Sequence, residues 1–321
     1  MMKVIKQVTA FFQKNFPLIT VALTIIGLAA PKVFLWARSY TTFFMSAVMF
    51  GMALTMEFSD FKILFQKPKI TIVGVSTSYL ISVGVAIITY KVLNLPLGLA
   101  VGLGICAACP GGVITDVMTF IANGDVPLSV GLSSVATLIS PIATPGLVYL
   151  MFREQVEVNA GSMISSLIFS VALPVVLGIA LKNLFRKQME DVEEVSPLLS
   201  FLGLSMVIGV SVASNGSALW SMTPKIFIAV VVFISVPTII GYYIPLFFKL
   251  TEKQCRTIAF ETGLKNSVLG SQLAIVAFAN LQDQGVALPG IIIALMASII
   301  APIFAKYWAK KDERLALEMG E

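Results

Sequence analysis

Three ionisable residues of this chain lie within long apolar stretches, where charges are rare. Asp116 occupies one such stretch, and Glu261 and Lys265 occupy another. Because a charge at the centre of a bilayer costs about 2.5–3.5 kcal/mol on insertion scales, such residues usually serve an ion or substrate path. Glu261 and Lys265 are also four positions apart, so on a regular helix they share a face and can form a structural salt bridge. The three charges therefore predict either an ion path or a buried ion pair.

Hydroxyl and amide side chains cluster beside these charges. Thr115 adjoins Asp116, and Asn266 and Ser267 follow Lys265. Further hydroxyl residues recur at helical spacing in the next apolar stretch, namely Ser129, Ser133, Ser134 and Thr137. A single Ser or Thr is uninformative, since its hydroxyl can bond a carbonyl of its own helix. Together with two carboxylates, these hydroxyls are the hard oxygen ligands that a small cation prefers, which favours an ion path.

Two short segments near the charges are expected to interrupt their helices. The segment "CPGGV" (109–113) combines a proline, which lacks a backbone donor, with two glycines that favour non-helical dihedrals. The segment "ETGLKNS" (261–267) contains a glycine among small polar residues. Broken backbone at membrane depth is tolerated only where protein or water satisfies the freed groups. We predict breaks near Gly111–Val113 and Gly263–Leu264, with the two helices crossing near the bilayer centre; a simple kink at the proline is the alternative.

The amino-acid composition shows whether these helices lie in water or in a membrane. Of 321 residues, 57% are hydrophobic and 12% are charged, whereas soluble domains carry about 25% charged residues. We therefore predict an all-α integral membrane protein. The absence of histidine excludes His-dependent nucleophiles and histidine-ligated metals, and three cysteines are too few for a disulfide framework. We expect no cofactor and no enzymatic activity, although Asp116 and Glu261 are nominally an aspartyl dyad.

The intervals between charges repeatedly match the roughly 20 apolar residues that cross a bilayer. They give ten predicted spans, the first at residues 17–36 and the tenth between Asp283 and Lys306. With both termini inside, sixteen Lys and Arg residues lie on the cytoplasmic side and five lie outside, in keeping with the positive-inside rule. Lys265 completes the total of 22, so the net charge of +5 reflects topology and implies no nucleic-acid partner. The longest hydrophilic stretch, Lys182–Pro197, is too short for a soluble domain, so residues 1–321 form one membrane domain.

Ten spans divide naturally into two halves of five. Because five is odd, the second half would enter the membrane from the opposite side, as in inverted-repeat transporters. A faint sequence echo supports this division, since Gly112–Met118 precedes Gly263–Leu269 by 151 positions. Both segments fall in the fourth span of their half, and both contain ionisable groups. We therefore predict a 5+5 inverted repeat.

Two long motifs resemble the bile acid:sodium symporter family. Residues 109–145, "CPGGVITDVMTFIANGDVPLSVGLSSVATLISPIATP", are similar to the family's CPGG-T-x-S-N-V-M-T-Y-L-A stretch, and residues 255–274, "CRTIAFETGLKNSVLGSQLA", to its E-x-G-x-Q-N-S stretch. The segment "FGMALTMEFSDFK" (50–62) is also similar. The resemblance covers about residues 15–310. It implies a panel of spans 1, 2, 6 and 7, about 15–58 and 160–215, and a core of spans 3–5 and 8–10, about 68–153 and 224–309.

The resemblance also implies two sodium sites behind the crossing and an organic anion bound between core and panel. Carried over to this sequence, the first sodium site consists of Thr115, Asp116, Ser129, Ser133 and Glu261. The second consists of Glu261, Lys265 and Ser78, with the backbone oxygens of Thr262 and Leu264. Substrate contacts fall on Gly112, Val113, Asn266 and Ser267.

Two positions depart from the family's pattern. Lys265 stands where the family has glutamine, and Asp116 stands where it has asparagine. An ammonium in the second site would supply the charge that the ion normally supplies. Two unit charges about 4 Å apart repel by roughly 4 kcal/mol at an effective dielectric near 20, which is about three orders of magnitude in affinity. We therefore expect the second sodium site to be lost, with Asp116 balancing the charge of the lysine.

These observations predict a secondary active symporter of small organic anions, bile-acid-like or other carboxylates, in an inner or plasma membrane. Sodium, through one site, is the expected coupling ion. A proton-coupled carrier that uses Asp116 or Lys265 is the alternative, because burial and the nearby carboxylates act on the lysine in opposite directions. A channel is disfavoured, since the charges cluster at one depth instead of lining a pore. The identity of the substrate and the oligomeric state stay open.

Overall fold

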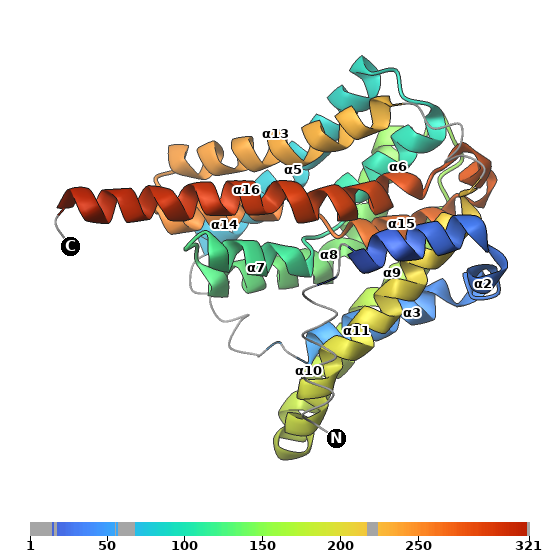
Figure 1. The fold of residues 1–321 in the computed structure, drawn as a ribbon, viewed down its shortest axis with the longest axis horizontal. Coiled ribbons are helices and arrows are strands. Elements are labelled where there is room, and N and C mark those ends of the chain that lie inside the picture. The colour runs from blue at the N-terminus through green and yellow to red at the C-terminus, as the bar shows by residue number, and fades with distance from the viewer. Residues whose placement is uncertain (1–14, 16–17, 55, 57–67, 217–223, 320–321) are drawn as a thin grey trace.

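The computed structural model describes residues 15, 18–54, 56, 68–216 and 224–319 (Figure 1). Within these ranges every element is helical and no strand is present. One isolated antiparallel bridge joins Gly111 and Lys265. The all-α prediction is confirmed for this part of the chain.

Among the residues that the structure describes, six helices are long and apolar enough to cross a membrane. They lie at Pro68–Val92 (α5), Val126–Phe152 (α8), Ala160–Leu184, Ser196–Ser214, Lys225–Phe247 (α13) and Leu288–Asp312. Ala160–Leu184 comprises α9 (Ala160–Leu167), the π-helical η2 (Ile168–Ala172) and α10 (Leu173–Leu184). Ser196–Ser214 is the apolar part of α11 (Arg186–Ser214), and Leu288–Asp312 is that of α16 (Leu288–Met319). Six such helices are typical of a multi-pass membrane protein.

Shorter helices account for most of the remaining described residues. They are Leu18–Ala29, α2 (Lys32–Leu35), η1 (Arg38–Tyr40), α3 (Thr41–Ala53), α6 (Leu97–Ala108), α7 (Val113–Ile121), α14 (Glu252–Gly263), α15 (Ser267–Ala277) and η3 (Ala279–Gln284). The predicted first span, 17–36, is divided at Pro31, which caps α2 and has no amide hydrogen with which to continue the preceding helix.

The outer surfaces of the helices are apolar, while small residues line the contacts between them. Phe120, Ile142 and Phe247 are 73%, 80% and 84% exposed. So much exposed apolar surface is unfavourable in water but matches the hydrocarbon of a bilayer. Gly241 on α13 and Gly263 on α14 leave no room for a Cβ against the facing helix, which allows the two backbones to approach closely.

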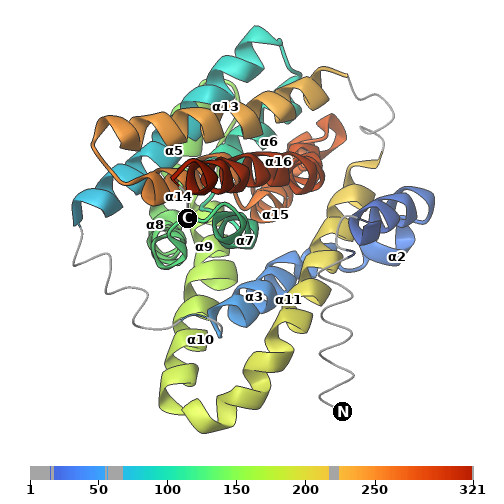
Figure 2. The same cartoon turned by 60° about the vertical axis from the view of Figure 1, so that its left-hand side comes forward.

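Figure 2 shows helices from distant parts of the chain gathered into two groups. In one group, α3 packs against η2, α10 and α11. In the other, α13 packs against α5, α14 and α16. The short helix α15 packs against α6 and α16 of the second group and also touches α3, α9 and α11. The α15 helix therefore connects the two groups.

Two helices are interrupted at the predicted positions. The backbone is extended at Cys109 and Gly112, between α6 and α7, and non-helical at Leu264 and Asn266, between α14 and α15. The two interruptions pair with each other, because the Asn266 amide donates to the Pro110 carbonyl (2.8 Å) and the Gly112 amide to the Leu264 carbonyl (3.4 Å). The breaks are confirmed, and they pair with each other, so that the freed carbonyls of Pro110 and Leu264 accept hydrogen bonds within the protein. The position of this pairing at the bilayer centre stays a prediction.

Candidate functional site

A buried carboxylate lies beside the crossing of the two extended segments. Glu261, near the end of α14, is 2% exposed. Its Oε1 accepts hydrogen bonds from the hydroxyls of Ser133 (2.8 Å) and Ser129 (3.1 Å), one turn apart on α8. A carboxylate in an apolar interior is stable only when such donors replace water. The helical spacing of the two serines therefore serves to place both hydroxyls on one oxygen.

The break in the first interrupted helix brings its backbone against the same carboxylate. A Cβ at Gly111 would overlap Glu261 Oε2 and would lie 3.0 Å from the Ser133 hydroxyl. Only glycine allows this approach. The Pro-Gly-Gly run thus has a positional role as well as a helix-breaking one.

The half-helix α7 adds two buried threonines to this region. Thr115 and Thr119, one turn apart, are both 0% exposed. The Thr119 hydroxyl donates to Ser129 Oγ (3.4 Å), and that of Thr115 donates to the Gly112 carbonyl. Thr119 was not among the predicted residues, although its position one turn after Thr115 on α7 was a usable signal.

Hydrogen bonds link Thr119, Ser129, Ser133 and Glu261 between α7, α8 and α14, and Thr115 lies one turn before Thr119 on α7. We call them the oxygen cluster: Thr115, Thr119, Ser129, Ser133 and Glu261. Asp116, in the first turn of α7, is half-buried and follows Thr115 directly. Such hard oxygens suit an alkali cation. Within the described residues no three His, Cys, Asp or Glu side chains come together as a transition-metal set would require.

The predicted contact between Glu261 and Lys265 is not formed. The α14 helix ends at Gly263, so Lys265 lies on the extended segment and no longer shares a helix face with Glu261. Among the described residues no ion pair within 4.0 Å involves either side chain. The Lys265 ammonium instead donates to Ser78 Oγ on α5 (2.5 Å) and lies 5.0 Å from the ring centroid of Tyr79. The alternative of a direct structural salt bridge is therefore wrong.

Hydroxyl groups on α5 donate hydrogen bonds to backbone carbonyls near Lys265. The Ser78 hydroxyl donates to the Glu261 carbonyl (2.8 Å), and the Ser82 hydroxyl donates to that of Thr262 (2.6 Å). The Leu264 carbonyl accepts a hydrogen bond from the Gly112 amide at the crossing. We call Ser78, Ser82 and Lys265 the Lys265 cluster. Its groups are buried and present donors where the resemblance implied a second cation.

The sequence profile of the Sodium Bile acid symporter family matches residues 42–222, more than half of the chain. This chain belongs to that family. The uncharacterized sodium-dependent transporter YocS of Bacillus subtilis (strain 168) is 33% identical over 313 residues, which cover 98% of this chain and 96% of the relative. The probable sodium/metabolite cotransporter BASS1 of Arabidopsis thaliana, a chloroplastic protein, is 29% identical over 287 residues, 89% of this chain and 71% of the relative. The resemblance seen in the motifs is confirmed, and these relatives are described as transporters.

The predicted substrate contacts of this family member gather at the starts of two half-helices. Gly112 precedes α7, and Asn266 caps α15 by accepting from the Leu269 amide (3.1 Å). Ser267 begins α15 and is 5% exposed. Val113 begins α7, and its side chain is not among those described. Helix N-termini present unpaired amides and a positive dipole end, which together attract an anion.

One buried amide links this region to the other group of helices. Gln272 on α15 is 0% exposed, and its Nε2 donates to Ser166 Oγ on α9 (3.0 Å) and to Thr42 Oγ1 on α3 (3.2 Å). The sequence analysis did not single out this residue. Its contacts come from two segments distant in the chain, so no local pattern marks it.

Proposed function

We propose that this protein is a secondary active symporter that moves a small organic anion, bile-acid-like or another carboxylate, together with sodium. The observation that carries this proposal is the oxygen cluster, in which buried Glu261 meets hydroxyls from α7 and α8. The description of YocS as a sodium-dependent transporter supports sodium as the ion. The inner or plasma membrane, with both termini in the cytoplasm, is the proposed setting.

The proposed architecture has ten spans in a 5+5 inverted repeat. Six long helices and two interrupted ones, α6–α7 and α14–α15, support it. In this arrangement residues 15–58 and 160–215 form a panel. Residues 68–153 and 224–309 form a core, which contains both interruptions and moves against the panel.

The proposed sodium site uses the oxygen cluster together with Asp116. Thr115, Asp116 and Thr119 supply ligands from α7, Ser129 and Ser133 from α8, and Glu261 from α14. A cation there would be coordinated by the carboxylate oxygens of Glu261, which the serine hydroxyls now stabilise. Those hydroxyls would turn their lone pairs toward the cation. Because the ligands come from three elements, ion binding would fix the position of α7 against α14.

In the place of a second sodium we propose the ammonium of Lys265. Ser78 and Ser82 already donate to the nearby carbonyls, so a cation there would displace two hydrogen bonds and would face a positive charge. Repulsion of roughly 4 kcal/mol at about 4 Å, with an effective dielectric near 20, is sufficient to prevent binding at ordinary sodium concentrations. The carrier would then couple to one sodium ion.

Uptake by purified protein in proteoliposomes tests this function. A panel of labelled organic acids is added under an inward sodium gradient, and potassium replaces sodium in the control. We expect concentrative uptake only in sodium, with Ser133→Ala reducing the response. Ser134→Ala is the matched control, because that hydroxyl donates to the Val130 carbonyl of its own helix. Equal uptake in both salts would refute sodium coupling.

A proton-coupled carrier is the second candidate. It is favoured by the burial of Lys265, which is 3% exposed and donates to a neutral hydroxyl instead of a carboxylate. A buried charge without a counter-ion is costly, so release of its proton during the cycle is chemically reasonable. Uptake driven by an inward pH gradient in sodium-free buffer would establish this alternative.

A further inference from the structure

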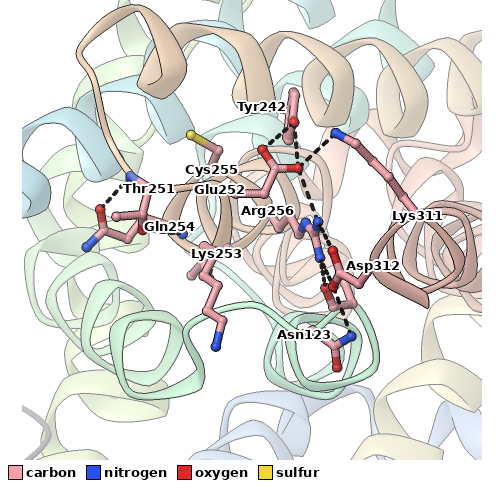
Figure 3. Close-up of polar contacts among 12 residues, drawn as sticks. Asn123, Tyr242, Thr251, Glu252, Lys253, Gln254, Cys255, Arg256, Lys311 and Asp312 are labelled. Atoms are coloured by element: carbon pink, nitrogen blue, oxygen red, sulfur yellow. Dashed lines mark hydrogen bonds and ion pairs between the residues drawn. The ribbon is translucent and has the colours of Figure 1, made fainter. Parts of the chain in front are cut away.

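A charged network joins the end of α7 and the first turns of α14 to α16 (Figure 3). Its centre is Arg256 on α14, which is 1% exposed. The two terminal nitrogens of the guanidinium donate to the two carboxylate oxygens of Asp312 on α16, each at 2.6 Å (Figure 3). Such a bidentate pair has a defined geometry as well as a favourable energy. Arg256 thus fixes α16 to α14.

The same guanidinium also holds the end of α7. It donates to the carbonyl of Ala122, the residue after α7, at 2.9 Å. Asn123 follows with a positive φ of 53°, and its side-chain Nδ2 donates to Asp312 Oδ2 (3.0 Å; Figure 3). A cation at a helix C-terminus is favoured by the helix dipole. One charged pair therefore contacts three elements.

Neighbouring contacts extend the attachment on both sides. The backbone amide of Asp125, in the turn after α7, donates to the Thr257 hydroxyl on α14 (2.8 Å). Glu252 accepts from Arg256 (3.2 Å) and from Lys311 on α16 (3.3 Å; Figure 3). The turn between α7 and α8 is therefore bound to the α14 helix that carries Glu261.

We infer that the Arg256–Asp312 pair is a positioning clamp for the sodium site, an inference that rests on the proposed function. Thr115 and Thr119 come from α7, whereas Glu261 comes from the same helix as Arg256. The clamp sets the position of α7 along α14, and with it the fit of the oxygen cluster to the ion. Through Asp312, the far end of α16 becomes part of the coupling machinery without touching the ion.

The sodium dependence of thermal stability distinguishes positioning from simple stabilisation. Purified wild type and Asp312→Asn are titrated with sodium at constant ionic strength, with potassium as the balancing ion. We expect the half-saturating sodium concentration to rise about tenfold, within the range for mutations that act on a remote ligand site. Lys311→Gln is the matched control, since Lys311 contacts Glu252 but neither Arg256 nor α7. It should leave sodium affinity unchanged.

A double-mutant cycle shows whether the effect passes through α7. Thr119→Ala is combined with Asp312→Asn, and the losses in sodium affinity should be smaller together than the sum of the two single changes. Should Asp312→Asn fail to fold, Arg256→Lys provides the same comparison, because lysine keeps the charge but loses the planar fork. A lower melting temperature without sodium, but an unchanged half-saturating concentration, would refute the clamp alone. A wild type without any sodium response would refute the proposed function as well.

Discussion

At the scale of single residues, Glu261 serves two polar regions through different atoms. Its carboxylate accepts from Ser129 and Ser133, while its backbone carbonyl accepts from Ser78. The ammonium of Lys265 binds that same Ser78 hydroxyl and not the carboxylate. The side chain of Glu261 is therefore available to a cation although a lysine lies nearby.

Replacing Glu261 by alanine should abolish sodium-dependent stabilisation and uptake. Two buried hydroxyls would lose their acceptor, which typically costs about 1–3 kcal/mol of stability. The loss is smaller than that expected for breaking a buried ion pair, because no direct pair with Lys265 exists. Thermal unfolding in sodium and in potassium measures both effects, with Ser134→Ala as control. Uptake by Glu261→Ala at the wild-type rate would contradict the assignment.

Lys265→Gln should create a second sodium dependence. Without the ammonium, the carbonyls of Glu261 and Thr262 no longer face a fixed positive charge. The Hill coefficient for sodium in uptake should rise from near one toward two, more clearly when Asp116→Asn is added. Cooperative two-sodium behaviour in the wild type, unchanged by the substitution, would show that Lys265 does not replace an ion.

Glu252 gives the network in Figure 3 a dependence on pH. Burial would raise the pKa of this carboxyl, but hydrogen bonds from Tyr242, Arg256 and Lys311 outweigh it and hold the pKa below its usual range. The stabilisation is therefore fully present above the unfolded pKa of about 4.3 and is lost as the pH falls through the lower folded pKa.

The difference in stability between wild type and Glu252→Gln should follow this window. It should amount to less than about 1 kcal/mol at neutral pH, because the carboxylate is partly exposed. It should vanish in acid. Thermal unfolding between pH 3 and about pH 7 checks this, and a difference that persists unchanged in acid would exclude the carboxylate charge as its cause.

At the scale of elements, the interrupted helices depend on close backbone approach. Gly111→Ala should weaken the sodium response strongly, because the new methyl group would overlap the Glu261 carboxylate. Gly146→Ala on α8 is the control, since its added Cβ would meet no described atom within 4 Å beyond its chain neighbours and the backbone of its own helix. The sodium titration of stability measures both. Equal responses in the two variants would mean that the carboxylate does not occupy this position.

The interruptions were predictable from the sequence, whereas several contacts that hold the site were not. Proline and adjacent glycines act on their own backbone, so "CPGGV" marks a break without knowledge of any neighbour. The roles of Ser82 and Gln272 depend on which helices pack together, and serine or glutamine alone carries no such information. The alternative of a Glu261–Lys265 salt bridge is wrong for a related reason, since the predicted break ends α14 at Gly263 and Lys265 no longer shares a helix face with Glu261.

At the scale of the whole molecule, α15 connects the predicted substrate contacts with the other group of helices. It begins at the crossing with Ser267, and its Gln272 contacts α3 and α9. A movement of one group against the other must therefore break or remake these hydrogen bonds. The net charge of the ions and substrate transported in such a movement decides whether a membrane potential drives transport.

Uptake of a monocarboxylate should be insensitive to an imposed membrane potential. One sodium and one monovalent anion carry no net charge. A potassium diffusion potential set with valinomycin should leave the accumulated level unchanged in the wild type. In Lys265→Gln with a second sodium, each 100 mV would add about 2.3 kcal/mol, roughly fifty-fold in accumulation. A wild type that responds to voltage would contradict one-sodium coupling.

The ammonium of Lys265 is covalently attached to the protein, so its effect on charge transport differs from that of a bound sodium ion. Because Lys265 stays with the protein, any movement of its charge during transport is reversed when the empty carrier returns, and it contributes nothing to the net current over a cycle. With the proposed coupling of one sodium ion to one monovalent anion, the steepest anion gradient that the carrier can sustain equals the sodium gradient. Depolarisation would then leave the accumulated substrate in place, whereas loss of the sodium gradient would release it.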